Sequence, residues 1–261
     1  MKKSFAIILL CSAFLAFSCN QEKAPEEQVP EYPVMGEYSF VDVDVLEISG
    51  ICLSPDKSFL YAISDDVKEG KGGLYSLSFD GTQVKHVCKI ERDCEGLALN
   101  PLTNDIYLAI EREQAIVRLS APDYQKSEDI CVIKNEGYDT NKGLEGLCYY
   151  KDNLLFVGNQ SPAELRIVSC ESGETVAEPI VLPVITEIAA LWYDSEKDYL
   201  WVSDSNRGFL YIFSLEGEVL QSYNIKFVRN AEGICVDKER GCVWVCTDGE
   251  DKLFKIEFQG L

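Results

Sequence analysis

The stretch "DCEGLALNPLTNDIYLAIERE", from Asp93 to Glu113, contains two apolar runs separated by "NPLTND". Asn, Pro, Thr and Asp favour turns, so the stretch predicts two short strands joined by a turn. The first run begins with a Glu between a Cys and a Gly, and the second ends on acidic residues. An unpaired carboxylate is costly to bury, so the Glu at the head of an apolar strand needs an explanation.

The same pattern occurs five times along the chain, which indicates a repeat architecture. The opening runs are "EISGICLSP" from Glu47, "DCEGLALNP" from Asp93, "GLEGLCYYK" from Gly143, "EIAALWYDS" from Glu187 and "NAEGICVDK" from Asn230. The small residue before Leu or Ile serves as an anchor in each copy, at Gly50, Gly96, Gly146, Ala190 and Gly233. Successive anchors are therefore 43 to 50 residues apart.

Each copy continues with a second and a third strand-like run, and the first four copies also have a fourth. Helical periodicity is missing from this part of the sequence. Four short strands per repeat are typical of β-propeller blades. The fifth copy ends without its fourth strand, whereas "GEYSFVDVDV", from Gly36 to Val45, is a strand with no blade before it. We therefore predict an all-β, five-bladed β-propeller closed by its N-terminal strand, with six blades as the alternative.

The N-terminal residues have the pattern of an export signal. Lys2 and Lys3 precede an apolar run that is shorter than the ~20 residues of a spanning helix, which is typical of a signal peptide. Small residues before Cys19 resemble the lipobox of bacterial lipoproteins, which implies lipid attachment at Cys19; a plain secretory signal is the alternative. The predicted domains are a signal peptide (1–18), a lipidated Cys with a flexible tether (19–34) and the propeller (35–261).

This organisation implies a lipoprotein held in the outer membrane of a Gram-negative cell envelope through its lipid, on the periplasmic or the surface face. The 44 acidic residues against 24 basic ones give a net charge of -20, which opposes binding to nucleic acid. We expect a monomer whose partner is a small ligand or an envelope protein. The nine cysteines of the body are odd in number and lie mostly in apolar runs, so free buried thiols are expected.

Four pairs of runs carry a family resemblance: "EISGI" with "YAISDD", "DCEGLAL" with "YLAIERE", "GLEGLCY" with "FVGNQS", and "NAEGICVD" with "WVCTDG". This pattern resembles the SdiA-regulated (YjiK-like) propeller family, which is related to the propellers called esterase-like activity of phytase. The resemblance covers nearly all of the body. It implies a propeller, and its phytase-like relatives are calcium-dependent binders of phosphate esters. An enzyme class does not follow from it.

In a propeller the first strand of each blade lines the central channel, so equivalent residues face one axis. In three blades a Glu directly precedes the anchor, and in the other two a Glu lies two residues earlier, on the same strand face by the period of two. These residues predict a ring of carboxylates at one channel mouth: Glu47, Glu95, Glu145, Glu187 and Glu232. Converging carboxylates raise one another's pKa unless a cation or hydrogen-bond donors compensate. Calcium fits such an oxygen-rich, irregular site best. The alternatives are hydrogen bonding of each Glu to backbone N–H groups of the next blade, or a catalytic acid or base.

Polar residues at the ends of the second strands are predicted to surround the same mouth and to bind a ligand. They are Asp65, Glu111, Arg112, Asn159, Asp204 and Asp248. Turn formation is the alternative role for the Asp and Asn residues. Arg112 is expected to pair with Glu111 or Glu113, or to hold an anionic ligand. Trp192, Trp201 and Trp244 lie in strand runs, where packing between blades explains them better than a sugar-stacking platform does.

Two functions remain open after this reading. The first is a lipid-anchored binding module whose acidic, calcium-binding channel mouth holds a small ligand or a partner. The second is a calcium-dependent hydrolase of phosphate or other esters that resembles the phytase-like propellers. The catalytic residues are not identified, because a nucleophile motif is missing from the sequence. A phytate hydrolase needs several Lys and Arg residues near its substrate, whereas acidic residues dominate here, which favours the binding module.

Overall fold

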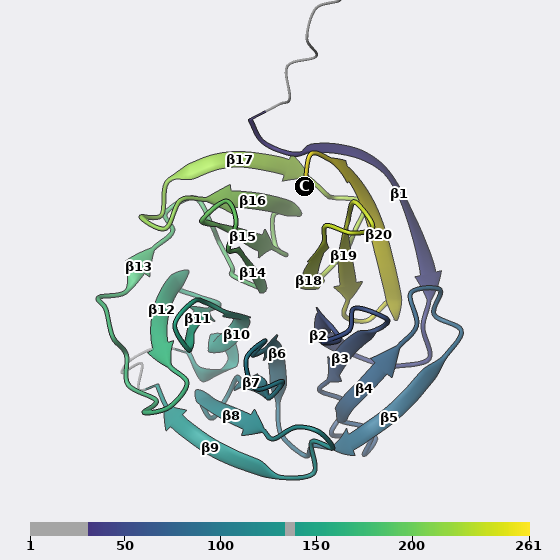
Figure 1. Cartoon of the computed structure of the whole chain (residues 1–261), viewed down its shortest axis with the longest axis vertical. Helices are drawn as coiled ribbons and strands as arrows, with labels where there is room; N and C mark the ends of the chain where they lie inside the picture. Colours follow the sequence, from purple (N-terminus) through teal and green to yellow (C-terminus); the bar gives the residue numbers. More distant parts are fainter. Residues whose placement is uncertain (1–30, 134–138) are drawn as a thin grey trace, which may run out of the picture.

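The computed structural model describes residues 31–133 and 139–261, which form five four-stranded antiparallel sheets around a central axis (Figure 1). The predicted signal peptide, Cys19 and most of the predicted tether lie outside the described residues. The prediction of an all-β propeller is confirmed, and the number of blades is five. Helical structure in the described part amounts to one 3-10 turn, η1 (Thr140–Lys142).

The strands of the first two blades follow one another in the sheet as they do in the sequence. Blade one consists of β2 (Ile48–Leu53), β3 (Leu60–Ser64), β4 (Gly73–Leu77) and β5 (Val84–Lys89). Blade two consists of β6 (Cys94–Leu99), β7 (Ile106–Ile110), β8 (Ala115–Leu119) and β9 (Ser127–Val132). The first strand lies nearest the axis and the fourth lies at the rim (Figure 1).

The next two blades repeat this order. Blade three consists of β10 (Leu144–Tyr149), β11 (Leu154–Asn159), β12 (Glu164–Ser169) and the short β13 (Ile180–Val181). Blade four consists of β14 (Ala190–Asp194), β15 (Tyr199–Asp204), β16 (Phe209–Phe213) and β17 (Val219–Asn224). The predicted repeat therefore corresponds to one blade.

The ring is closed by the N-terminal strand, as predicted. Blade five combines β18 (Ala231–Asp237), β19 (Cys242–Thr247) and β20 (Lys252–Gln259) with β1 (Val34–Asp42), which pairs antiparallel to β20. The hydroxyl of Tyr223, in blade four, also donates a hydrogen bond of 2.6 Å to the carbonyl of Pro33. Both ends of the folded chain are thus held in one blade, and β20 is not left as a free sheet edge.

The hydrophobic core is divided into five parts, each of which lies between two neighbouring blades. Trp201 is completely buried between blades four and five, where it contacts Tyr223 and Phe258. Trp244 stacks on Phe79 of blade one, with ring centroids 5.1 Å apart. Packing between blades is therefore confirmed for these two Trp residues, and blade contacts rather than a single central core hold the disc together.

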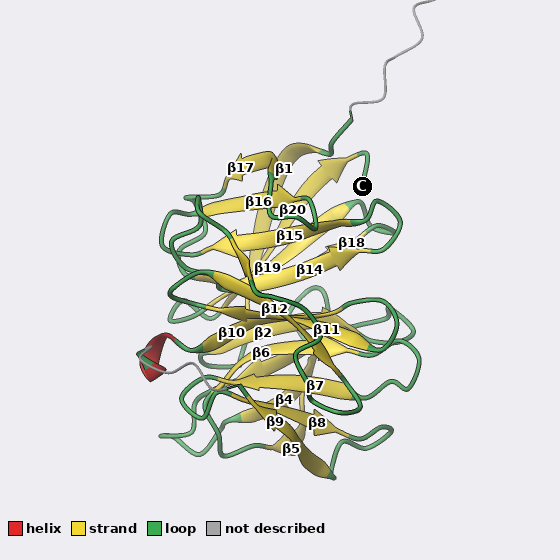
Figure 2. Ribbon diagram, turned by 90° about the vertical axis from the view of Figure 1, so that its left-hand side faces the viewer, coloured by secondary structure: helices red, strands yellow, loops and turns green. Residues whose placement is uncertain are grey.

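The nine cysteines of the body are free thiols and most of them are buried, in agreement with the sequence-based expectation. In the described part of the chain, helices of the length and hydropathy needed to cross a bilayer are lacking. Seen from the side, the molecule is a disc whose two faces are covered by loops, and η1 projects from the face on which the first strands begin (Figure 2).

Candidate functional site

The first strands of four blades are irregular next to one channel mouth. In blade one the pairing with β3 shifts between Ile48 and Gly50, so Ser49 is an extra residue in its strand. The same shift occurs in blades two, three and five, and the extra residues there are Glu95, Glu145 and Glu232. A β-bulge of this kind redirects a side chain out of the regular alternation. It therefore explains how a Glu can begin an apolar strand.

The Gly that follows each of these Glu residues permits close contact between neighbouring blades. A Cβ atom on Gly96 would lie 1.9 Å from the carbonyl oxygen of Glu145. A Cβ atom on Gly233 would lie 2.9 Å from Cα of Gly50. Any side chain at these positions would force neighbouring first strands apart. The recurring Glu-Gly pair thus combines a carboxylate at the mouth with the tight packing that closes the channel wall.

Three carboxylates come together between blades one and two. Asp65 follows β3, Asp93 precedes β6, and one oxygen atom from each of Asp65, Asp93 and Glu95 lies within 4.8 Å of the others. Burial, and then repulsion from Asp65, raises the pKa of Glu95 to about 9. Burial, and then repulsion from Glu47, raises the pKa of Asp65 to about 7. Without a cation this cluster retains protons at neutral pH.

Glu145 and Glu232 continue the acidic surface around the axis. Glu145 is 6% exposed, and its Oε2 atom has no hydrogen-bond partner among the described residues. Burial, followed by repulsion from Glu232 and Glu95, raises the pKa of Glu145. The pKa of Glu232 is raised to about 7 by burial and then by repulsion from Asp248. Backbone N–H groups of the next blade do not reach Oε2 of Glu145, so the hydrogen-bonding alternative leaves this oxygen atom unexplained.

The other two members of the predicted ring come before the first strands of their blades. Glu47 precedes β2 in a left-handed backbone conformation, with φ of 48°, and is partly exposed. Glu187 accepts a hydrogen bond of 2.6 Å from Nζ of Lys142. Its charge nevertheless contributes to the raised pKa values of Glu145 and Glu232. All five residues are therefore linked electrostatically to the mouth, and binding of a metal by them stays a prediction.

Glu111 and Arg112 join the cluster from the end of β7. Burial, and then the neighbouring Asp93 carboxylate, raises the pKa of Glu111 to about 7. Arg112 lies with its Nε atom 3.3 Å from Oδ2 of Asp93 and donates to Oδ1 of Asn141 at 3.1 Å. Of the alternatives that the sequence left open for Arg112, pairing with Glu113 is not found among the described residues, and Arg92 donates two hydrogen bonds to the Glu113 carboxylate instead. Arg112 is largely exposed, and its positive charge is paired with the Asp93 carboxylate of the acidic cluster.

The second-strand ends occupy equivalent positions in four blades, as their backbone hydrogen bonds show. The N–H groups of Asp65, Glu111, Gln160 and Asp248 donate to the carbonyls of Glu47, Asp93, Gly143 and Asn230, respectively. The member from blade three is therefore Gln160, whereas the sequence alignment placed Asn159 there. Burial raises the pKa of Asp248. A hydrogen bond from the backbone of Gly249 lowers this pKa, and repulsion from Asp251 raises it.

Asn159 and Asp204 have hydrogen-bond partners in loops beside the mouth. The amide of Asn159 donates a 2.8 Å hydrogen bond to the carbonyl of Pro162. The two oxygens of Asp204 accept hydrogen bonds of 2.8 Å from the backbone N–H and the hydroxyl of Thr186. The bonds from Thr186 join the loop before β14 to the end of β15, and Asp204 also accepts a 3.0 Å hydrogen bond from the backbone N–H of Arg207 in its own turn. Turn formation is the alternative that the sequence left open for these two residues. Their assignment to ligand binding stays an untested prediction.

Two residues of this site were missing from the sequence-based list. Asp93 completes the three-carboxylate cluster, and its signal was its position two residues before Glu95, which matches that of Glu47 in blade one. Gln160 carries a buried Oε1 atom that lacks a hydrogen-bond partner among the described residues. Its position became recognisable only from the backbone register of blade three.

The fold and the site define a five-bladed β-propeller with a carboxylate-rich channel mouth. The model of the phytase-like family described as "Esterase-like activity of phytase" matches residues 44–168, which extend from the start of blade one into blade three. The chain is thus similar to this family over its first part. Comparison with curated proteins found no match in sequence.

Solved structures support the fold. Glutaminyl cyclase from Myxococcus xanthus superimposes with a TM-score of 0.61 at 14% identity, covering 87% of this chain and 96% of the cyclase. A Bacteroides thetaiotaomicron protein of unknown function gives a TM-score of 0.59 at 16% identity, covering 82% of this chain and 60% of that chain. At identities this low, the similarity supports the propeller fold alone, and function must be inferred from the site.

Proposed function

We propose that this protein is a binding module whose acidic channel mouth takes up a divalent cation, with calcium as the expected ion. The supporting observation is the cluster of Asp65, Asp93 and Glu95, whose oxygens lie within 4.8 Å of one another. A cation would replace the protons that the carboxyl groups of Asp65 and Glu95 retain at neutral pH. It would also offset the repulsion between carboxylates that contributes to their raised pKa values.

The residues present fit a calcium ion. Every candidate ligand is a carboxylate or an amide oxygen, and calcium prefers six to eight such oxygens in flexible geometry. The unpartnered Oε2 of Glu145, in β10, and Oε1 of Gln160, which follows β11, are further buried oxygens in blade three. A soft-metal site would need His or Cys ligands, and the metal-ligating group found among the described residues contains carboxylates alone. When bound, the ion would attract an oxygen-bearing group of a ligand to the mouth.

Titration calorimetry with calcium chloride tests this proposal. The wild-type chain is expected to bind calcium with release of protons, and Glu95→Gln and Glu145→Gln are each expected to weaken binding at least tenfold. Glu216→Gln is the matched control, because Glu216 lies in the exposed β16–β17 turn, outside the mouth. Calcium binding that is equal in all four proteins would contradict the assignment of the mouth.

Hydrolysis of esters is the second candidate, and the match to the phytase-like family over residues 44–168 is the observation in its favour. The basic residues at the mouth speak against phosphate esters as substrates. Lys142 is paired with Glu187, and Arg112 with Asp93, so each positive charge is already neutralised. Turnover of a panel of phosphate and carboxylic esters by the calcium-loaded chain decides between the two candidates. Turnover that Glu95→Gln abolishes would replace the binding module by the hydrolase.

We further propose that the protein is exported and anchored in the outer membrane by a lipid on Cys19. The support is the sequence before Cys19, since these residues lie outside the described part. Detergent phase partitioning of the cell-expressed protein tests the anchor. Wild type is expected in the detergent phase and Cys19→Ala in the aqueous phase, with Cys11→Ala as the control. Equal partitioning of wild type and Cys19→Ala would indicate the plain secretory signal.

A further inference from the structure

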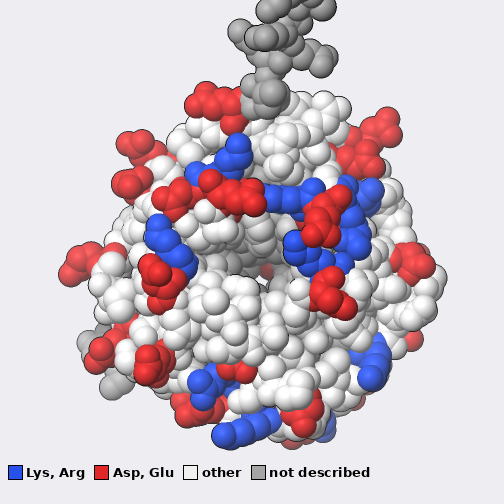
Figure 3. Space-filling model, in the orientation of Figure 1, with Lys and Arg blue, Asp and Glu red and all other residues white. Residues whose placement is uncertain are grey.

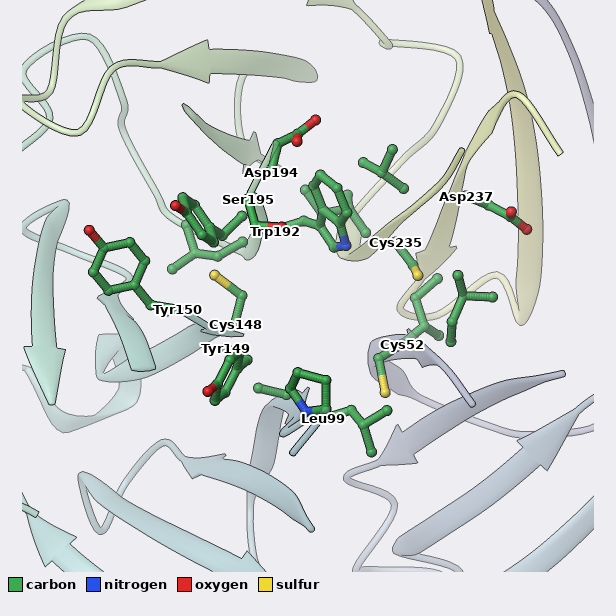
Figure 4. Close-up of a pocket in the computed structure, with 18 of the residues that line it drawn as sticks. Cys52, Leu99, Cys148, Tyr149, Tyr150, Trp192, Asp194, Ser195, Cys235 and Asp237 are labelled. Atoms are coloured by element: carbon green, nitrogen blue, oxygen red, sulfur yellow. The ribbon is translucent and has the colours of Figure 1, made fainter. Parts of the chain in front are cut away.

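The opposite mouth of the channel contains a cavity of about 440 Å³. It lies at the C-terminal ends of the first strands, whereas the carboxylates lie at their N-terminal ends. From Ser49 to Leu53 a strand rises by roughly 13 Å, at about 3.3 Å per residue, so the two sites are separate. The inner wall is apolar and is formed by equivalent residues of the blades, among them Leu53, Leu99, Tyr149 and Val236. Figure 4 shows Leu99 and Tyr149 in this wall.

Trp192 provides an aromatic surface with an unused hydrogen-bond donor. It is partly exposed and lines the cavity, unlike Trp201 and Trp244, which are buried between blades. Figure 4 shows its indole at the edge of the opening, with the ring nitrogen on the side of the cavity. Among the described residues, neither a hydrogen bond from this nitrogen nor a ring contact of Trp192 is present. Trp192 also packs against the core between blades four and five, in agreement with the sequence-based interpretation, but it leaves part of its ring exposed to the cavity.

The charged residues around this cavity neutralise one another. Lys57 contacts Glu239 at 2.6 Å, and Lys238 contacts both Asp194 and Glu196, at 2.9 and 2.8 Å. Figure 3 shows basic and acidic side chains mixed around the central hollow of this face. An ionic ligand would have to displace one of these pairs. An uncharged ligand would leave them intact, so the cavity favours uncharged molecules.

The thiols in the wall do not change this preference. Cys52, Cys148 and Cys235 line the cavity, and burial raises the pKa of each thiol. Thiols of this kind stay protonated and behave as small apolar groups rather than as nucleophiles or metal ligands.

We propose that this cavity is a second binding site, for an uncharged, planar aromatic molecule that carries a carbonyl or ring-nitrogen acceptor. The aromatic ring would lie against Trp192 and Tyr149, and the acceptor would receive the indole N–H of Trp192. The volume is within the range of small-molecule sites, about 300–1,000 Å³, and the combination of an apolar wall with few polar groups is typical of them. This site is independent of cation binding at the acidic mouth.

Nile red, an uncharged planar dye with a carbonyl group, is a suitable probe, because its emission shifts to the blue in apolar surroundings. Titration of the full chain is expected to give saturable binding of one dye per chain. Bound dye should also protect the tryptophan emission from quenching by acrylamide, since Trp192 is the accessible Trp of the described residues. Trp192→Phe keeps an aromatic ring but removes the donor, so a two- to tenfold loss of affinity is expected.

Two substitutions in the cavity and two controls outside it complete the test. Trp192→Ala is expected to weaken Nile red binding at least tenfold, and Leu99→Trp is expected to do the same by filling the cavity. Val181→Trp adds the same ring to an exposed site on β13 and should bind like wild type. Glu145→Gln should also bind the dye like wild type, which separates this site from the acidic mouth. Dye binding that is not saturable, or that survives Trp192→Ala in a folded protein, would overturn the proposal.

Discussion

The carbonyl oxygen of Glu145 occupies the space in which Gly96 would carry a side chain, 1.9 Å from the position of a Cβ atom. The first strands of blades two and three thus approach each other closely where the acidic mouth begins. Gly96→Ala is therefore expected to push these strands apart, at a cost of about 1–3 kcal/mol or more in the free energy of unfolding. Chemical denaturation measures this cost.

Gly36→Ala is the matched control for that substitution. A Cβ atom on Gly36 would lie 3.4 Å from the carbonyl of Glu257, which is an ordinary contact, and Gly36 lies in the outer strand β1. We expect Gly36→Ala to change the free energy of unfolding by less than Gly96→Ala does. Equal effects would mean that the close approach of the inner strands is not required for stability.

Glu145→Gln is expected to stabilise the protein when metal is removed. Burial and its acidic neighbours raise the pKa of Glu145, so the neutral form is preferred in the fold, and Gln mimics that form. A gain in the free energy of unfolding near pH 8, larger than the gain near pH 5, is expected in the presence of a chelator. Thermal unfolding in EDTA measures it, and Glu216→Gln should show no gain. Destabilisation by Glu145→Gln in EDTA would contradict this prediction, because it would indicate that hydrogen-bond donors stabilise the charged carboxylate of Glu145.

Stability without metal should also depend on pH. The pKa values of Asp65, Glu111 and Glu232 are raised to about 7, and that of Glu95 to about 9. The same groups titrate near pH 4 in the unfolded chain. Between these limits the unfolded chain has lost protons that the folded chain still holds, so the free energy of unfolding falls as pH rises from about 4 through about 9.

Denaturation curves in EDTA near pH 5 and near pH 9 measure this loss. Saturating calcium should reduce the difference between the two curves, because the cation takes the place of the protons. An unfolding free energy that is independent of pH in EDTA would show that the mouth carboxylates do not repel one another as the structure implies.

The blade count and the closure could be predicted from sequence because they depend on local patterns. Alternating apolar residues, turn residues and a fixed spacing recur in each copy, and β1 was recognisable as a strand without a blade. The position of the carboxylates was predictable for the same reason. Glu95, Glu145 and Glu232 occupy one position relative to their anchors, and the structure places them in the irregular part of each first strand.

The finer geometry of the site was not accessible from the sequence. A two-residue alternation predicted Glu47 on the same face as the inner position, but the shift in register at Ser49 interrupts that alternation, and Glu47 has a left-handed backbone. Gln160 and Asn159 differ by one position, and hydrogen-bond register alone distinguishes them. The partner of Arg112 depends on a contact with Asp93 across two loops, which no local pattern encodes.

Removal of the N-terminal strand should open the ring. A chain that begins at Val43 lacks β1, so the N–H and C=O groups of β20 that face β1 lose their partners, and Tyr223 loses its hydrogen bond to Pro33. Each backbone hydrogen bond contributes about 1 kcal/mol, so a loss of several kcal/mol in the free energy of unfolding is expected. An exposed strand edge also promotes association between chains.

A chain that begins at Tyr32 keeps β1 and is the matched control. Size-exclusion chromatography and thermal unfolding should show a stable monomer for the longer chain and aggregation or a lower midpoint for the shorter one, whereas identical behaviour would show that blade five is stable with three strands.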